Sequence, residues 1–245
     1  MGLDSKLYML YDILGDTLRT GPLLWKVDRF RTEDIKDHLS DLTMMILILE
    51  KYFPDNLDYF LMIKYIFVHD IEETITGDIT HFEGVSKEEK ERVNNIAMNY
   101  ITNRFDRVLD FNKLFTEYEE HITLEAKIIH MLDKVDSSIP FLKYDGETLI
   151  NMDNPEVIEA LRYSKAVIEG RKKFNTVGEI FFDYHLRNVH FTDEELIKYN
   201  ISRETANKIT TAIREFMHGI LIESKKVKEL KEDFPKEAII YNKHL

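Results

Sequence analysis

Apolar residues recur at helical spacing along most of the chain. Residues 59–68 are apolar at all but one position and contain neither glycine nor proline, which predicts a helix buried on most sides. Residues 35–53 carry one apolar stripe with His38 beside it, and we expect Thr32 to be the N-cap and Pro54 to end the helix. There is no Asn-Gly hairpin and no alternating strand pattern. The sequence therefore predicts an all-α fold.

Capping residues and helix breakers mark the other predicted helices. Ser86 with Glu89 and Thr192 with Glu195 have the spacing of capping boxes. Together with the apolar stripes, these signals predict helices at residues 3–14, 86–105, 112–120, 123–140, 154–173 and 202–231. We expect one main domain over residues 1–190, followed by a C-terminal helical extension, residues 191–245, packed on it.

Potential metal ligands follow the most apolar helix directly. Residues 67–78 contain one imidazole and four carboxylates. Buried charges need a partner, and the adjacent His69 and Asp70 offer nitrogen and oxygen ligands to a divalent cation. Two ligands do not complete a site, so we add His38 and Asp133, which lie on predicted helices on either side.

The same segment offers further carboxylates near the expected ligands. Helical spacing places Glu73 one turn beyond His69, whereas we expect its neighbour Glu72 to be exposed. Gly77 allows a turn that brings Asp78 back toward the same cavity.

The order His, His-Asp and a distant Asp resembles the metal signature of the HD-domain metal-dependent phosphohydrolases, and within them the bacterial 5′-deoxynucleotidases and their HD-domain-containing relatives. The similar stretches are Arg31-Thr-Glu-Asp-x-x-Asp-His38, His69-Asp-x-x-Glu-x-x-Thr-Gly-Asp78, Glu117-Tyr-Glu-Glu120 and Glu125-Ala-Lys-x-x-x-x-Leu-Asp-Lys134. They lie in roughly the first 145 residues. The last stretch implies that Asp133 is the ligand, with Asp136 beside it.

The resemblance implies an HD-domain helical bundle with additional C-terminal helices. It also implies an enzyme that removes phosphate from (deoxy)nucleoside 5′-monophosphates with one divalent metal ion, Mn, Co or Fe rather than Zn. Glu73 would orient or deprotonate the attacking water, and Asp78 would hold a sugar hydroxyl or protonate the leaving oxygen. A homodimer is also implied.

The expected substrate contacts depart from the family pattern. The deoxynucleotidases carry an Arg-Trp pair where this chain has Gly21-Pro22, with two more residues before His38. We therefore take Trp25 and Arg19 as replacements for that pair. The candidates for phosphate contact are Arg19, Lys26, Arg29 and Arg31.

Composition limits the partners. A net charge of −12 argues against a nucleic-acid polymer, because proteins that bind one need a basic surface. The chain has no cysteine, so disulfides, thiolate zinc sites and cysteine nucleophiles are excluded. The first residues carry Asp4 and no apolar run of signal-peptide length, and no segment reaches the roughly 20 apolar residues of a membrane span. We expect a soluble, cytoplasmic protein.

Other functions are compatible with parts of this pattern. A deoxynucleoside triphosphate triphosphohydrolase could use the same fold, and a non-catalytic, metal-stabilised helical scaffold could keep the ligands, although it would not need Glu73 or Asp78. A guanosine tetraphosphate hydrolase would continue the His-Asp motif differently, and a cyclic dinucleotide phosphodiesterase would need a Gly-Tyr-Pro motif that is absent. Three histidines could serve a second metal, but we favour solvated or core positions for them: His81, His121 and His130.

Overall fold

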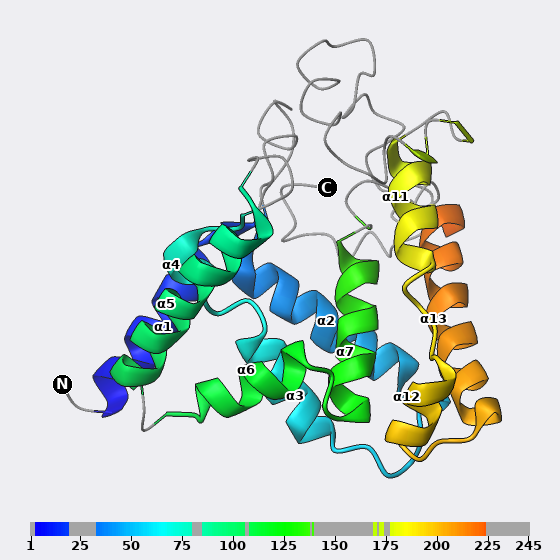
Figure 1. Ribbon diagram of the computed structural model, residues 1–245, viewed down its shortest axis with the longest axis horizontal. Helices are drawn as coiled ribbons and strands as arrows, with labels where there is room; N and C mark the ends of the chain where they lie inside the picture. The colour runs from blue at the N-terminus through cyan, green and yellow to red at the C-terminus, as the bar shows by residue number, and fades with distance from the viewer. Residues whose placement is uncertain are drawn as a thin grey trace, which may run out of the picture.

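The computed structural model describes residues 3–19, 33–79, 85–105, 108–137, 139, 169–170, 172–173 and 177–223. Helices dominate these parts, which confirms the all-α prediction (Figure 1). The described strands are a two-residue antiparallel ladder in which β1 (Leu18–Arg19) pairs with β2 (Glu33–Asp34). This ladder lies between α1 (Leu3–Asp16) and α2 (Ile35–Leu49) in the chain.

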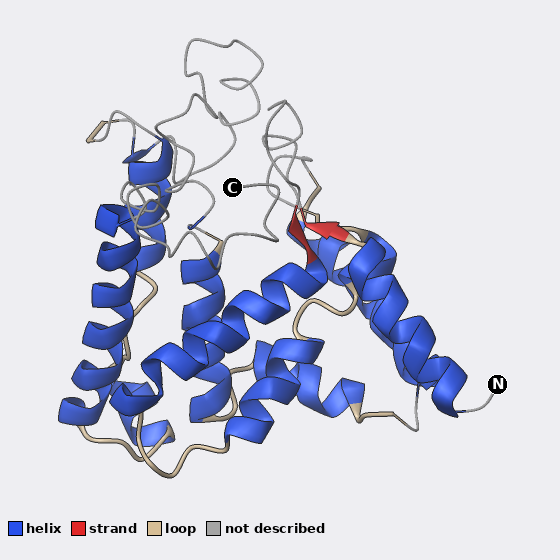
Figure 2. Cartoon of the chain, turned by 180° about the vertical axis from the view of Figure 1, so that it is seen from behind, coloured by secondary structure: helices blue, strands red, loops and turns tan. Residues whose placement is uncertain are grey.

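Three helices form the centre of the fold. α2, α3 (Tyr59–Val68) and α7 (Leu124–Asp136) each pack against the other two. In Figure 1, α2 passes behind α7, and Figure 2 shows the molecule from the opposite side. The bounds of α3 agree with the apolar run at residues 59–68 that predicted it.

α2 begins later than its sequence predicts. Asp34, and not Thr32, is the N-cap: its side chain accepts a hydrogen bond from the backbone N–H of Asp37 (2.9 Å), and the Asp37 side chain accepts one from the Asp34 N–H (3.5 Å). The prediction was wrong because Asp34 is extended (φ −97°, ψ 172°) where β2 pairs with β1. A residue in a ladder cannot also lie in the first turn of a helix.

α7 follows its prediction closely. Thr123 is its N-cap and accepts a hydrogen bond from the Ala126 N–H at 3.1 Å. The expected inward side chains, Ile129, Leu132 and Val135, are fully buried. The helix therefore has a well-fixed rotation, which determines where the polar residues near its C-terminal end point.

The remaining elements flank this centre. They are α4 (Glu73–Thr76), α5 (Lys87–Phe105), α6 (Phe111–Glu119), α11 (Val177–Leu186), α12 (Asp193–Lys198), α13 (Arg203–Glu223) and a 3₁₀ turn, η2 (Glu50–Tyr52). In Figure 1, α4 and α6 lie to the left of α7, and α11, α12 and α13 lie to its right. α11 was not predicted. Pro140, most of the helix predicted at residues 154–173, and the chain beyond Glu223 lie outside the described residues.

The two predicted capping boxes have different outcomes. At Thr192 both reciprocal hydrogen bonds with Glu195 are present, so that prediction is confirmed. Ser86 accepts a hydrogen bond from the Glu89 N–H at 3.2 Å, but the Glu89 carboxylate pairs with Arg92. A nearby guanidinium outcompetes the backbone N–H because a charge-assisted pair is stronger.

The C-terminal helix shares the central core. Ile209, Ile213 and Met217 of α13 belong to the same buried apolar cluster as side chains of α2, α3 and α7. The division into residues 1–190 and 191–245 stays a prediction. Within the part of the chain that the structure describes, no helix is both long enough and apolar enough to cross a bilayer.

Candidate metal centre

Four side chains from the central helices converge on one point. His38 lies on α2, His69 caps the C-terminal end of α3, Asp70 follows it, and Asp133 lies on α7. One ligand atom from each lies within 4.8 Å of the others. The two imidazoles are almost completely buried, with 0% and 2% of their surface exposed. The four ligands expected from the sequence are therefore brought together.

The tautomers of the two histidines leave room for a cation. The Nδ1 of His38 lies 2.5 Å from the Oδ2 of Asp136, and the Nδ1 of His69 lies 2.7 Å from the carbonyl oxygen of Ile66. Both partners accept hydrogen bonds, so each neutral ring carries its proton on Nδ1. The two Nε2 atoms then face each other with lone pairs, 2.9 Å apart. A metal ion bound to both Nε2 atoms would remove the repulsion between these lone pairs.

The carboxylates complete the ligand set. The Oδ2 of Asp70 lies 3.2 Å from His69 Nε2 and 3.6 Å from His38 Nε2. The Oδ1 of Asp133 lies 3.5 Å from His38 Nε2 and 3.9 Å from His69 Nε2. Two imidazole nitrogens and two carboxylate oxygens around one point suit a borderline or hard divalent ion. The residues present therefore fit a metal.

Lys134 holds the outer oxygen of Asp133. Its Nζ lies 2.9 Å from Asp133 Oδ2, whereas Oδ1 is the oxygen that faces the imidazoles. Burial by itself would raise the pKa of Asp133, but the Lys134 ammonium opposes burial, and that pKa lies well below its ordinary value. Asp133 is thus ionised and oriented as a metal ligand should be.

Comparison with known proteins identifies the family. The HD-domain family profile matches residues 12–173, which is more than half of the chain. The chain belongs to the HD-domain family. The 5′-deoxynucleotidase hdd1 of Schizosaccharomyces pombe is 32% identical over 138 residues, which cover 54% of this chain and 67% of that protein. The 5′-deoxynucleotidases HDDC2 of Xenopus laevis and Homo sapiens are 31% and 30% identical over 129 residues, covering 52% of this chain and 62% and 61% of their own.

A solved structure supports the fold over almost the whole chain. A predicted metal-dependent phosphohydrolase from Magnetospirillum magnetotacticum MS-1 has a TM-score of 0.52 and 16% sequence identity, and the match covers 91% of this chain and 93% of that one. At this identity the likeness shows the HD-domain fold alone. The membership that the motifs implied is confirmed.

Two neighbouring carboxylates, Glu72 and Glu73, are buried where the chain turns after His69. Glu73 is buried with 8% exposed, as expected for a residue beside the metal ligands. Glu72 is also buried, with 5% exposed, so the prediction that it faces solvent was wrong. The reason is that α3 ends at Val68 and residues 69–72 form tight turns, while α5 packs against α4 on the other side.

Glu72 is held by α5. The Asn94 amide donates a hydrogen bond to Glu72 Oε1 at 3.1 Å, while Glu72 Oε2 and Asn94 Oδ1 are both buried acceptors without a donor. Burial, with the nearby charge of Asp70, raises the pKa of Glu72 well above its ordinary value. When Glu72 is protonated, its hydroxyl group can donate to an acceptor such as the Asn94 oxygen.

The other predicted site residues are placed unevenly. Asp78 follows Gly77, whose φ of +73° provides the expected turn, and is half-buried. Its role at the site stays a prediction. Arg19 lies in β1. The remaining expected substrate contacts lie outside the described residues, as does one of the three histidines considered for a second metal: Trp25, Lys26, Arg29, Arg31 and His81.

Two residues near the ligands were missed. Lys134 was recognised only as part of a motif, although a lysine directly after a metal-ligand aspartate is a usable signal. His185 of α11 lies 3.4 Å from Ser137, and burial, with the charge of Lys134, lowers its pKa to about 4. His185 was missed because its helix was not predicted, although Thr176 and Glu179 ahead of it have the spacing of a capping box.

His121 and His130 lie together away from the ligands, with ring centroids 4.2 Å apart. Burial, followed by nearby lysine charges, lowers the pKa of both, that of His130 to about 3. The cluster that could hold a metal among the described residues includes neither. They are neutral, partly buried histidines, in agreement with the interpretation favoured from the sequence.

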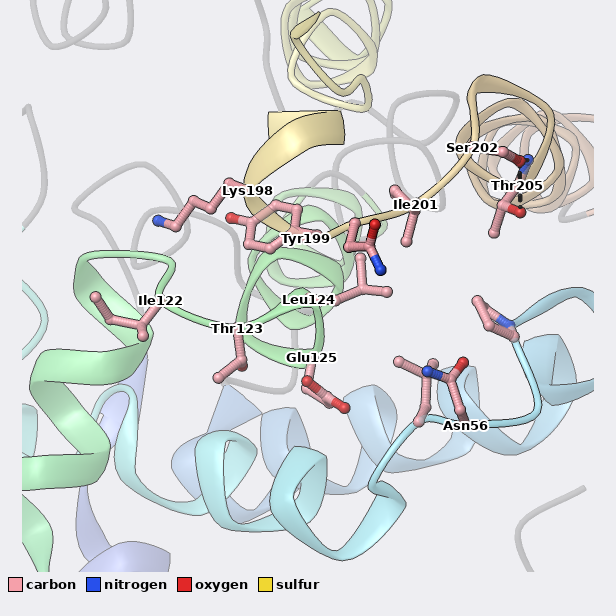
Figure 3. A pocket seen from close by; sticks show the side chains of 13 residues that line it. Asn56, Ile122, Thr123, Leu124, Glu125, Lys198, Tyr199, Ile201, Ser202 and Thr205 are labelled. Carbon is pink, nitrogen blue, oxygen red and sulfur yellow. Dashed lines mark hydrogen bonds between the residues drawn. The ribbon is translucent and has the colours of Figure 1, made fainter. Parts of the chain in front are cut away.

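A separate hollow lies at the other end of α7. It has a volume of about 420 Å³ and lies between the start of α3, the start of α7 and the turn from α12 into α13. Figure 3 shows Glu125, Lys198 and Tyr199 on its walls, and no metal ligand lines it. Because Thr123 and Asp133 are ten residues apart on α7, the hollow lies about 15 Å along the helix from the metal centre.

Proposed function

We propose that this HD-domain protein is a metal-dependent phosphohydrolase that removes phosphate from (deoxy)nucleoside 5′-monophosphates. The observation that carries the proposal is the pair of unprotonated Nε2 atoms, from His38 and His69, that face each other between two carboxylates. The three relatives named above are all 5′-deoxynucleotidases. A catalytically silent scaffold would not need the additional buried carboxylate of Glu73 beside such a site.

The ligands are His38, His69, Asp70 and Asp133. A divalent ion held there supplies Lewis acidity, which neutralises charge on the phosphate and favours ionisation of water. We propose Mn, Co or Fe in preference to Zn, as the family resemblance implies, and the nitrogen and oxygen ligands suit these ions. Asp136 fixes the ring of His38 from behind.

Protein groups provide the proton transfers. Glu73, buried at the start of α4, orients the attacking water and accepts its proton. Asp78, on the turn after Gly77, holds the 3′-hydroxyl of the sugar or gives a proton to the leaving 5′-oxygen. Lys134 adds a positive charge at the site where a phosphate dianion must approach carboxylates. Arg19 and Trp25 are the proposed contacts to the rest of the nucleotide.

The decisive experiment measures products from a panel of nucleotides with Mn²⁺ or Co²⁺. We expect inorganic phosphate from 2′-deoxynucleoside monophosphates and a slower reaction with a 2′,3′-dideoxy analogue, which lacks the hydroxyl that Asp78 would bind. Triphosphate released from deoxynucleoside triphosphates would instead support the triphosphohydrolase. No turnover of either substrate by metal-loaded protein would overturn the proposal.

Variants of Glu73 test the proposed chemistry. Glu73→Gln should keep the metal and slow hydrolysis by roughly 10²–10⁴-fold, the range for a lost general base. Glu120→Gln, which changes an exposed carboxylate, is the matched control and should keep full activity. Equal rates for the two variants would remove Glu73 from the mechanism. A cytoplasmic location and a homodimer are also proposed from the family resemblance.

A further inference from the structure

The segment that carries Glu73 and Asp78 has little structure of its own. α4 is a single turn of four residues, and an isolated turn is unstable because its few hydrogen bonds do not offset the cost of ordering the chain. Gly77 then ends it with a φ of +73°, and a Cβ added there would meet no atom within 4 Å apart from the adjacent residues. A glycine in open space does not restrict the backbone. The position of Asp78 therefore depends on contacts from other elements.

α5 packs beside α4 and contacts the chain on both sides of it (Figure 1). The Asn94 amide of α5 donates a hydrogen bond to the side chain of Glu72, directly before α4. One turn earlier on α5, the Lys90 ammonium donates a hydrogen bond to the carbonyl oxygen of Ile79 at 2.7 Å. Residues four apart lie on the same face of a helix. One face of α5 thus holds both ends of the segment that contains α4.

Lys90 differs from its neighbours at the start of α5. The residues around it, 85–89 and 91–92, are all exposed, whereas Lys90 is half-buried. An ammonium is strongly hydrated, and its hydrogen bond to an acceptor is about twice as strong as one from a neutral donor. The charge also acts toward the metal centre: burial and then the charge of Asp70 raise the pKa of Glu72, and the Lys90 ammonium opposes that rise. The side chain is therefore directed at the turn and not at solvent.

The contact from Lys90 bears on Asp78 more than on Glu73. Ile79 follows Asp78 directly, so a fixed Ile79 carbonyl restricts where the Asp78 side chain can lie. Glu73 belongs to α4, where its carbonyl oxygen accepts a hydrogen bond from the Gly77 N–H at 2.8 Å. Gly77 lies between the two carboxylates and can absorb a change of backbone direction. Loss of the Lys90 contact should therefore displace Asp78 and leave Glu73 in place.

We propose that Lys90 is a positioning residue, whose hydrogen bond to Ile79 holds Asp78 where that carboxylate meets the 3′-hydroxyl of the nucleotide. A misplacement of about 1 Å can cost on the order of 100-fold in rate, so one hydrogen bond at the turn is enough to matter. The inference rests on the proposed function, because it takes Asp78 as the group that recognises the sugar. It adds a control of that recognition by α5, a helix that supplies no metal ligand.

Steady-state kinetics of the full, metal-loaded chain test the inference with a 2′-deoxynucleoside monophosphate and its 2′,3′-dideoxy analogue. Lys90→Met keeps an unbranched side chain but removes its charge and its hydrogen-bond donor. We expect kcat/KM to fall by about 10- to 100-fold on the deoxynucleotide and to change little on the analogue, which has no 3′-hydroxyl to bind. Lys90→Arg should recover part of the loss, because a guanidinium can also donate to the carbonyl. Lys87→Met is the matched control and should behave as the wild type, since the Lys87 side chain is 85% exposed and pairs with Glu91.

A double variant separates positioning of Asp78 from direct contact between Lys90 and phosphate. If Lys90 acts through Asp78, the protein with both Lys90→Met and Asp78→Asn should be no slower than Asp78→Asn alone. Losses that add in the double variant, or an equal fall of kcat/KM on both nucleotides in a Lys90→Met protein with wild-type circular dichroism and metal content, would overturn the inference. So would an unchanged kcat/KM in Lys90→Met.

The wild-type protein shows whether the inference or the proposed reaction has failed. Turnover that does not distinguish the deoxynucleotide from its dideoxy analogue would overturn the role of Lys90 and leave the phosphohydrolase reaction intact. No turnover of either nucleotide would overturn both.

Discussion

At the scale of single residues, the opposed imidazoles make the metal part of the fold. Two buried lone pairs 2.9 Å apart repel each other unless one cation binds to both. We therefore expect His69→Ala to lose bound metal in elemental analysis and to unfold at a lower temperature than the wild type. Chelation should lower the melting temperature of the wild type but not of His69→Ala. Metal retained at one ion per chain by this variant would contradict the assignment, and His190→Ala, at an exposed site, is the control.

Lys134 connects ligand orientation with substrate binding. Its ammonium holds the outer oxygen of Asp133 and is the cation closest to the ligands among the described ion pairs. Lys134→Gln should raise KM for a nucleoside monophosphate by roughly 10- to 150-fold, since one charge-assisted contact is worth roughly 1.5–3 kcal/mol. Lys134→Arg should recover part of the loss. Steady-state kinetics at saturating metal distinguish this effect from weaker metal binding, and an unchanged KM would show that Lys134 serves only Asp133.

Glu72 should matter for stability through the hydrogen bond that it accepts from Asn94. Glu72→Gln keeps the size and a hydrogen-bond donor, so we expect it to unfold within about 1 kcal/mol of the wild type. Glu72→Ala leaves the buried Asn94 amide without its acceptor and should cost about 1–3 kcal/mol in urea unfolding. If the two variants lose equal stability, the hydrogen bond from Asn94 contributes nothing beyond packing.

The residue-scale predictions from sequence succeeded where spacing and chemistry agreed. The four ligands were found because their types and order are distinctive. Glu72 was misplaced because a continuous helix after His69 would give it a solvent-facing side. In the structure the helix ends at Val68, and α5, the next helix after α4, closes over the turn through Asn94. Periodicity cannot reveal a surface that another element covers.

At the scale of elements, a buried ion pair links α7 to α12. Lys127 is 7% exposed, and its Nζ lies 2.7 Å from Glu195 Oε1, while Glu195 Oε2 accepts a hydrogen bond from the Thr192 N–H at 2.8 Å. Glu195 thus pairs a buried ammonium and caps α12 at once. Its pKa is lowered, since the hydrogen bonds from Lys127 and Thr192 outweigh desolvation.

Removing this carboxylate should loosen the C-terminal helices. Glu195→Ala leaves the Lys127 charge buried without its partner, and we expect a loss of about 3–5 kcal/mol in denaturant unfolding. Glu194→Ala, one residue earlier and exposed, is the matched control and should stay within about 0.5 kcal/mol of the wild type. Equal losses of stability in Glu195→Ala and Glu194→Ala would show that negative charge at the start of α12, and not the ion pair with Lys127, provides the stabilisation.

Element boundaries were predictable where the signals were local. The apolar run of α3 and the Thr123 cap of α7 are contained within a few residues, and both were placed correctly. The start of α2 depends on a ladder between segments that are distant in sequence, so its N-cap moved from Thr32 to Asp34. The short apolar segment that became α11 was missed although Thr176 and Glu179 have the spacing of a capping box, and the helix packs against α7.

At the scale of the whole molecule, two buried histidines make stability depend on pH. The folded protein holds the pKa of His130 at about 3 and that of His185 at about 4, mainly through burial. Both rings are therefore neutral in the folded state, whereas an unfolded chain binds protons to them below about pH 6.5. Since the unfolded state binds more protons, the free energy of unfolding falls as pH decreases below about 6.5.

The size of this effect follows from the two pKa values. Between pH 7 and pH 5 each histidine should remove about 2 kcal/mol of stability. Denaturant unfolding across this range should show the loss, and His130→Gln, which cannot titrate, should reduce it by about half even if the variant is less stable at pH 7. The exposed His190→Gln should leave the slope unchanged. Both variants keep the metal ligands, so proton competition at the metal centre is the same in each of them and in the wild type. A difference between the slope of stability against pH in His130→Gln and the slope in the wild type therefore reports the His130 ring alone. A wild-type slope in His130→Gln would mean that His130 is protonated in the folded protein, which would contradict its burial against His121 and beside Lys134.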